Sequence, residues 1–249
     1  MKISIITVCY NSSNTIEDTI KSVINQNYFN NIQYIIVDGG SSDNTLQIIS
    51  KYSDKIDILI NEKDNGIYDA MNKGIQHATS DIVGILNSDD VFQDENVLSE
   101  IANFFSLDDK LDILYGDLVY VKSNDLNSVV RYWKSTNYYD KFFERGNVPP
   151  HPTLFLKSRI YKNEGGFDLN FSLASDYEFM LRVFKSNRYK SKYINRLLVR
   201  MRLGGATNKN YKNIYIGNHE IYKSWIQNRY LMPFYFFPLR IFRKIKQFI

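Results

Sequence analysis

Short apolar runs alternate with helical patterns through the first hundred residues of this 249-residue chain. Apolar runs of this length are typical of buried strands, and the segments between them carry helix caps and helical spacing. The predicted strands are residues 3–8, 34–37, 56–60 and 82–86, and the predicted helices are residues 16–27, 45–52 and 66–78. This order predicts an α/β fold, with a mostly parallel, Rossmann-like sheet and helices on both of its faces.

The pattern changes after residue 90, where strand signals follow one another more closely. The predicted strands are residues 113–115, 118–121 and 129–133, with turns between them, and residues 153–156 and 193–201. The predicted helices are residues 95–105, 175–185 and 214–230. Pro233 and Pro238 are expected to break the chain before residues 239–249. No linker separates the two halves, so we expect the second half to pack onto the first sheet.

Composition narrows the class of protein further. Hydrophobic residues make up 44% of the chain, which supports a well-formed core. Cys9 is the only cysteine, which excludes a disulfide framework, and its apolar neighbours predict a buried structural thiol. The first apolar run is too short for a signal peptide, and no run approaches the ~20 residues of a membrane span. These features predict a cytoplasmic protein.

The net charge of +4 conceals a strong asymmetry along the chain. Residues 1–178 hold 15 Lys and Arg against 26 Asp and Glu, whereas residues 179–249 hold 16 Lys and Arg and one acid, Glu220. A basic C-terminal third favours an anionic partner. Charge alone leaves open whether that partner is a membrane surface, a diphosphate or a nucleic acid.

Two adjacent acids, Asp89 and Asp90, follow the predicted strand 82–86 in the segment Leu-Asn-Ser-Asp-Asp. Like charges this close raise each other's pKa unless a cation or strong donors balance them. Clustered oxygen ligands at a strand end suit Mg²⁺ or Mn²⁺, which also take oxygens from substrate phosphates. The ordinary alternative is a solvated turn in which Asp90 caps the next helix.

Several polar residues follow the other predicted strands and are expected to converge at one sheet edge. They are Thr7, Tyr10, Asn11, Asp38, Gly39 and Asp64. A carboxylate can accept from a base N–H, a tyrosine can stack on a base ring, and glycine lets the backbone approach a ligand. Each residue alone has an ordinary explanation as a turn acid or core aromatic, but their convergence favours a nucleotide site. No dinucleotide fingerprint or P-loop sequence is present.

The second half offers a candidate general base. Asp176 and Glu178 lie in the first turn of the predicted helix 175–185, where they either complement the helix dipole or take a proton from a hydroxyl. His151 lies in a proline-rich loop and is expected to be structural unless a site forms around it. The segment 203–207 either brings backbone N–H groups to a phosphate or forms an ordinary turn.

Seven segments together resemble one family over nearly the whole chain. They are SIITVCYNSS, IIVDGGSSDNT, EKDNGIYDAMNKGI, LNSDD, GGFD, ASDYEFMLR and RLGGATN. In order and spacing they resemble the inverting family 2 glycosyltransferases of the GT-A fold. GIYDAMNKG with the later HP and SDYE segments resembles a narrower group, which transfers hexoses to lipid-diphosphate-linked sugars in bacterial O-antigen, lipopolysaccharide and related surface polysaccharide assembly.

The resemblance implies roles for individual residues. Thr7, Tyr10, Asp38 and Asp64 would hold the uridine, Asp89 would lie beside the sugar and ribose, Asp90 would hold Mn²⁺ or Mg²⁺, and Asp176 would be the catalytic base. Further nucleotide-sugar contacts are expected from Asn11, Gly39, Gly66, Asp69 and Lys73. The acceptor or diphosphate side is expected to include His151, Glu178, Arg202, Gly204 and Gly205.

Three positions depart from the family pattern. Ser175 replaces the first acid of the family's Glu-Asp motif, and the metal motif reads Asn-Ser-Asp-Asp. Many relatives carry Arg where this chain has Met71, so the diphosphate must be neutralised from elsewhere, by Lys73 or by the loop 202–209.

The resemblance also implies an organisation and a location. Residues 1–230 would form the glycosyltransferase domain, with a nucleotide-sugar half over 1–105 and an acceptor half over 106–230. The basic, aromatic tail over 231–249 has helical spacing, which favours a membrane-interface helix that turnover on a soluble acceptor does not need. The alternative is a helix packed on the domain with its basic side in water. With a membrane-interface helix, the enzyme would be peripheral on the inner face of the cell membrane.

The implied partners are a UDP-sugar, a lipid-diphosphate-linked GlcNAc or GalNAc and an anionic membrane surface, with no nucleic acid. A transferase acting on a later lipid-linked oligosaccharide, a nucleic-acid-binding module and a nucleotide-sugar-binding protein without turnover remain as alternatives.

Overall fold

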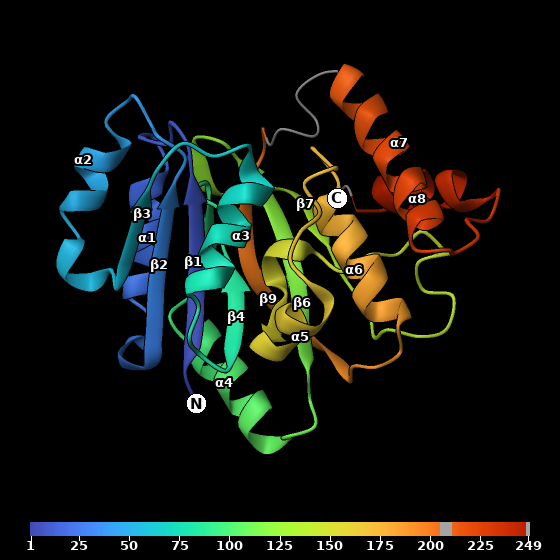
Figure 1. The fold of residues 1–249 in the computed structure, drawn as a ribbon, viewed down its shortest axis with the longest axis horizontal. Helices are drawn as coiled ribbons and strands as arrows, with labels where there is room; N and C mark the ends of the chain where they lie inside the picture. Colours follow the sequence, from blue (N-terminus) through green and yellow to red (C-terminus); the bar gives the residue numbers. More distant parts are fainter. Residues whose placement is uncertain (205–210, 248–249) are drawn as a thin grey trace.

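Nine strands form one sheet in the computed structural model, which describes residues 1–204 and 211–247 (Figure 1). They are β1 (Ile3–Cys9), β2 (Ile32–Asp38), β3 (Ile58–Asn61), β4 (Ile82–Ile85), β5 (Asp90–Phe92), β6 (Ile113–Lys122), β7 (Asp125–Trp133), β8 (Phe155–Lys157) and β9 (Ser191–Arg202). Their order is β3-β2-β1-β4-β8-β6-β9-β5, and β7 pairs with β6. The predicted α/β class is confirmed.

The N-terminal part of the sheet is parallel, as the alternation predicted. β1 pairs with β2 and β4, and β2 pairs with β3, all in parallel. Cys9 lies beside Asp38, and Asp38 lies beside Asn61, so the carboxyl ends of three strands meet at one edge. The Cys9 side chain is buried there, as expected for a structural thiol.

The C-terminal part of the sheet is mixed. β8 runs antiparallel to β4 and β6, β7 antiparallel to β6, and β5 antiparallel to β9, whereas β6 and β9 are parallel. The predicted turn between residues 115 and 118 is wrong, because β6 continues through it. A Cβ on Gly116 would lie 2.7 Å from the carbonyl oxygen of Arg196, so this glycine lets β9 approach closely.

Helices cover both faces of the sheet and bury two apolar clusters against it. One cluster includes residues of α1 (Ile16–Ile24), α2 (Thr45–Ser50) and α4 (Val97–Leu107). The other includes residues of α3 (Ile67–His77), α5 (Ser158–Glu164), α6 (Ser175–Lys185) and α7 (Tyr211–Gln227), and α7 packs on α6. Short 3₁₀ turns span Phe29–Asn31, Ser53–Lys55 and His151–Thr153.

The last helix, α8 (Phe236–Ile245), packs against the body beside α7 (Figure 1). The predicted break at Pro238 is wrong, because this proline lies in the first helical turn, where no intrahelical N–H bond is lost. Phe236 is fully buried, with its ring 5.6 Å from that of Trp225 and 6.4 Å from that of Tyr177. Among the described helices, α8 included, none is long and apolar enough to cross a membrane.

Candidate functional site

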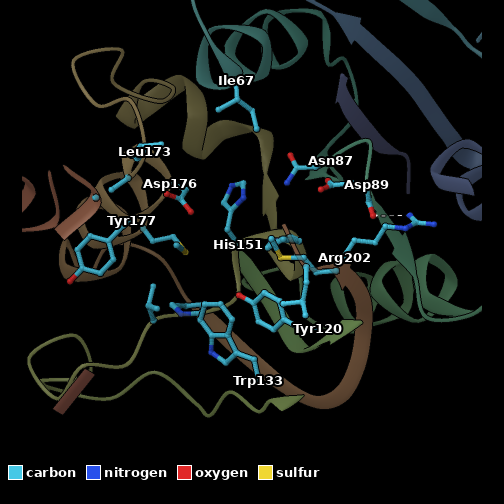
Figure 2. A pocket seen from close by; sticks show the side chains of 18 of the residues that line it. Ile67, Asn87, Asp89, Tyr120, Trp133, His151, Leu173, Asp176, Tyr177 and Arg202 are labelled. Carbon is cyan, nitrogen blue, oxygen red and sulfur yellow. Dashed lines mark hydrogen bonds between the residues drawn. The ribbon is translucent and has the colours of Figure 1, made fainter. Parts of the chain in front are cut away.

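A cavity of about 990 Å³ opens along the carboxyl edge of the parallel strands. Its wall extends from the loops after β1 and β3, past β4 and the start of α6, to β7 and α8. In Figure 2, Asn87 and Asp89 lie on one side of this space, Asp176 on the other, and His151 between them. Residues from all parts of the chain therefore share one site.

The end of the cavity beside β1 and β3 carries four of the predicted nucleotide contacts. Tyr10, Asn11, Asp64 and Gly66 all line it, and the Tyr10 side chain is 62% exposed. A Cβ on Gly39 would lie 2.2 Å from Asp64 Oδ2, so the glycine permits this close approach of the two loops. The Gly66 amide in turn donates to Asp64 Oδ1 at 2.9 Å, which orients the carboxylate.

Two other predicted nucleotide residues, Thr7 and Asp38, lie buried beneath this end. The Thr7 hydroxyl is 3.2 Å from that of Tyr34, and Asp38 Oδ2 accepts from the amides of Gly40 and Ser41. Asp38 thus shapes the loop that brings Gly39 against Asp64. Neither side chain is exposed to the cavity.

Asp69 and Lys73 do not reach the cavity, although both lie on α3. Asp69 Oδ2 accepts from the Asn65 amide at 2.9 Å, which closes the turn before the helix. Lys73 Nζ lies 2.9 Å from Glu62 Oε1 and 3.6 Å from Asp69 Oδ2. An ion pair between positions i and i+4 of one helix fits this geometry better than a contact with a diphosphate.

The adjacent acids have different surroundings. Asp89 lines the cavity with Asn87, and burial raises the pKa of its carboxyl. Asp90 begins β5, is fully buried, and does not cap the next helix. Burial, together with the Asp89 charge, raises the pKa of Asp90 well above its usual range. Asp89 is therefore the acid of this pair that reaches the cavity, and the metal contact expected at Asp90 stays a prediction.

Oxygen atoms at this point fit a divalent cation that is completed by a substrate. Asn87 Oδ1 and Asp90 Oδ1 are buried and have no hydrogen-bond partner among the described residues. Nowhere in the described part do three His, Cys, Asp or Glu side chains group as a metal site. Mg²⁺ and Mn²⁺ are often held by one or two carboxylates plus substrate phosphates, which is the donor set available beside Asp89.

Asp176 faces the cavity from the first turn of α6. The Tyr68 hydroxyl, from α3, donates to Asp176 Oδ1 at 3.0 Å and fixes the carboxylate. The His151 ring packs edge-on against Phe167 at 5.5 Å between centroids. Burial lowers the pKa of His151, and the Asp176 charge opposes this only in part, so the imidazole is neutral near pH 7. Sequence analysis missed Tyr68, whose apolar helical neighbours suggest a core position.

Glu220 on α7 holds the loop that precedes Asp176. Its two oxygens accept from the amides of Ser172, Leu173 and Ala174 at 2.8–2.9 Å and from the Ser172 hydroxyl at 2.7 Å. A carboxylate at the start of a helix satisfies its orphan donors and complements its dipole. The sequence offered one indication of a special role, because Glu220 is the one acid among residues 179–249.

Three of the five predicted acceptor-side residues line the cavity. His151, Arg202 and Gly204 line the cavity, whereas Gly205 lies outside the described residues. Arg202 donates to the Asp89 carbonyl oxygen at 2.9 Å and pairs with Asp18, so it supports the acid loop. Glu178 is buried with its carboxylate 2.9 Å from Arg182 Nε, which removes it as an alternative base.

Basic residues that sequence analysis did not assign to the site line the far end of the cavity. They are Arg131 from β7, Lys134 just after it, and Arg240, Arg243, Lys244 and Lys246 from the α8 region. Tyr120 and Trp133 form the adjoining wall, and the Arg131 guanidinium lies 4.3 Å from the centre of the Tyr120 ring. The charge asymmetry indicated an anionic partner but not the position of these residues.

Comparison with known sequences points to one family. The family model described as glycosyl transferase family 2 matches residues 4–160. An uncharacterized glycosyltransferase of Mycobacterium tuberculosis is 33% identical over 181 residues, which cover 72% of this chain and 68% of that protein. A PGL/p-HBAD biosynthesis glycosyltransferase of Mycobacterium bovis is 26% identical over 66% of this chain and 62% of its own length.

Solved structures share the fold at low sequence identity. S. aureus TarS 1–349 in complex with UDP-GlcNAc has a TM-score of 0.72 at 19% identity, covering 92% of this chain and 65% of that one. The mannosyltransferase PcManGT from Pyrobaculum calidifontis, in complex with GDP-Man and Mn²⁺, has a TM-score of 0.65 at 16% identity, covering 96% and 68%. The chain thus spans about two thirds of the length of the proteins that it matches.

Proposed function

The chain belongs to glycosyltransferase family 2 and has the GT-A fold, and from this premise we propose that it is a metal-dependent, inverting hexosyltransferase. The proposed donor is a UDP-sugar that carries glucose or galactose. The proposed acceptor is GlcNAc or GalNAc linked through diphosphate to undecaprenol, in O-antigen or related surface polysaccharide biosynthesis. The observation that carries the proposal is that Asp89 and Asp176 line opposite sides of one cavity (Figure 2).

The donor would occupy the end of the cavity beside β1 and β3. Tyr10 offers an exposed ring for stacking on a base, and Asp64 offers an oriented carboxylate. Asp38 would act by holding the loop around Gly39. The structural neighbours bind UDP-GlcNAc or GDP-Man, which supports a nucleotide-sugar but does not separate the two bases.

A divalent cation would be held by Asp89, with Asn87 beside it and the donor diphosphate completing its shell. When bound, such a cation stabilises the negative charge that develops on the leaving diphosphate. Arg202 would keep Asp89 in position through its hydrogen bond to the Asp89 carbonyl oxygen. The neighbour that binds GDP-Man contains Mn²⁺, which supports this choice of metals.

Asp176 would be the general base. The acceptor hydroxyl gives its proton to the Asp176 carboxylate while its oxygen bonds to the anomeric carbon of the donor. The bond from that carbon to the phosphate oxygen breaks on the opposite side, so UDP leaves and the configuration inverts. Tyr68 holds the carboxylate in place, and the neutral His151 ring adds no positive charge beside it.

The acceptor half would comprise residues 106–230, as the nucleotide-sugar half comprises residues 1–105. Residues 231–249 would add to the acceptor half, since α8 lines the cavity, and would also contact an anionic membrane surface. The enzyme would therefore work peripherally at the inner face of the cell membrane, where lipid-linked acceptors are glycosylated.

A substrate panel tests the proposal. Radiolabelled UDP-glucose, UDP-galactose and their N-acetyl forms are each incubated with synthetic GlcNAc- and GalNAc-diphosphate-lipids and Mn²⁺, with GDP-mannose for comparison. We expect transfer from a UDP-hexose with inversion at the anomeric carbon, seen by NMR. Transfer only to a lipid-linked disaccharide or longer acceptor would instead favour a later step, and salt-sensitive gel shifts with RNA or DNA would favour a nucleic-acid-binding module.

A further inference from the structure

The helix α8 closes the far end of the cavity, and we propose that α8 and Arg131 form a binding site for the acceptor's diphosphate. The site comprises Arg131, Arg240 and Lys244, and we name it the tail cation site. It rests on the proposed function, because that function supplies an acceptor that carries a diphosphate. It gives α8 a substrate-binding role in addition to membrane contact.

The first observation is the orientation of α8. An amphipathic helix on a globular protein normally buries its apolar face and exposes its charged face. In most of α8 this arrangement is not followed, since Ile241, Phe242 and Ile245 are 59%, 53% and 63% exposed, whereas Arg240 is half-buried and lines the cavity with the more exposed Lys244. Burial of Phe236 fixes the start of the helix, but the apolar side chains further along α8 stay exposed, so burial of apolar surface alone does not account for the cations that face the cavity.

The end of α8 is attached to β7 in a way that gathers the cations. The Gln247 carbonyl oxygen accepts from the Tyr132 amide at 3.0 Å, and Gln247 Oε1 accepts from Arg131 Nε at 2.7 Å. These bonds align the basic side of α8 with Arg131. The tail cation site is thus assembled from two segments more than a hundred residues apart in sequence.

Arg240 is the cation of this site that has an unsatisfied donor, although the Asp176 charge acts on it. Arg240 Nη1 is buried and has no hydrogen-bond partner among the described residues. Burial and the charges of Arg240 and Arg131 together lower the pKa of Lys244 to about 8. Gathering like charges in a partly buried space is unfavourable unless an anion binds between them. A diphosphate carries the required charge and offers several acceptor oxygens to guanidinium groups.

The position of the site favours the acceptor's diphosphate over the donor's. The residues suited to the nucleotide lie at the β1 and β3 end of the cavity, whereas the tail cation site lies at the β7 and α8 end. Its Arg240 guanidinium lies 5.6 Å from the centre of the ring of Tyr177, the residue that follows Asp176. An acceptor sugar at Asp176 would extend its diphosphate toward α8. Its lipid would then leave across exposed apolar side chains, namely Phe234, Ile241, Phe242 and Ile245.

Kinetics with two soluble acceptors test this assignment. One acceptor is GlcNAc-diphosphate on a short alkyl chain, and the other is the corresponding alkyl GlcNAc glycoside without phosphate. We expect Arg240→Gln and Lys244→Gln each to lower the ratio of kcat/KM for the first acceptor over the second at least tenfold, with the KM for the UDP-sugar unchanged. Lys162→Gln, which removes an exposed charge on α5, is the matched control and should leave the ratio unchanged.

A binding measurement separates this inference from the proposed function. Inorganic diphosphate is titrated by calorimetry into the full chain saturated with UDP and Mn²⁺, and each variant's folding is checked by its melting temperature. Wild type should bind diphosphate at least tenfold more tightly than Lys244→Gln, even if no acceptor in the panel is glycosylated. Equal diphosphate binding by wild type and both variants would contradict the assignment of the tail cation site to the acceptor. So would variants that raise the KM for the UDP-sugar and leave the ratio of kcat/KM for the two acceptors unchanged.

Discussion

At the scale of single residues, Asp176 is the group on which the proposed chemistry depends. Asp176→Asn keeps the shape and the bond from Tyr68 but cannot take a proton, so turnover should fall ~100-fold or more. Single-turnover kinetics and UDP binding by calorimetry measure this, and UDP affinity should not change. Near-normal turnover would remove Asp176 from the mechanism. Tyr68→Phe, which removes only the orienting bond, should have a smaller effect.

The two adjacent acids should respond differently to substitution. Asp89 lines the cavity and Asp90 is buried with a raised pKa. We expect EDTA to abolish transfer, Mn²⁺ or Mg²⁺ to restore it, and Asp89→Ala to prevent that restoration. Asp90→Asn keeps the shape of a buried side chain that does not line the cavity, and should retain metal-dependent activity. The measurement is transferase activity of each variant across a Mn²⁺ titration. If only Asp90→Asn lost its response to Mn²⁺, Asp90 and not Asp89 would be the metal ligand.

His151 should make the fold sensitive to acid. Because burial lowers its pKa below the ordinary value of 6.5, the unfolded chain takes up a proton below pH 6.5 that the folded chain does not. The free energy of unfolding therefore falls as the pH drops from 6.5 toward the folded-state pKa, and this contribution is retained in full above 6.5. Urea unfolding between pH 7 and 5 should show a shallower decline for His151→Gln. Parallel curves for the two proteins would contradict this.

At the scale of elements, the start of α6 is held by a side chain from α7. Glu220→Gln replaces one acceptor oxygen with an NH₂ group that faces the Leu173 and Ala174 amides, or the Ser172 amide if the group is flipped. Leaving such donors unsatisfied costs ~1–3 kcal/mol each. We expect a lower melting temperature and a lower kcat with little change in UDP affinity. Glu95→Gln, an exposed acid outside the cavity, is the control.

At the scale of the whole molecule, residues 231–247 pack against the glycosyltransferase domain. The sequence predicts that turnover on a soluble acceptor survives their removal, but Phe236 is fully buried and α8 lines the cavity. We now expect deletion of residues 233–249 to lower both the melting temperature and the turnover on a soluble diphosphate acceptor. Binding to anionic liposomes should also fall, as sedimentation would measure. Unchanged turnover would instead support the expectation from the sequence that the tail is not needed for turnover on a soluble acceptor.

Sequence by itself determined the parallel half of the sheet and most of the acids around the cavity. The reason is local, because apolar runs identify strands and the carboxyl ends of parallel strands share one edge. Tyr10, Asp64 and Asp89 follow three such strands, so their convergence does not depend on the remainder of the chain. The start of α6, and with it Asp176, was predicted for the same kind of reason.

Tertiary structure alone decided which way side chains and helices face. Asp89 and Asp90 are chemically identical neighbours, and only the pairing of β5 with β9 buries the second of them. Helical spacing defines two faces of α8 but does not say which one meets the body. Phe236 and the bonds of Gln247 to β7 set that orientation. These contacts join residues far apart in sequence, so no local pattern encodes them.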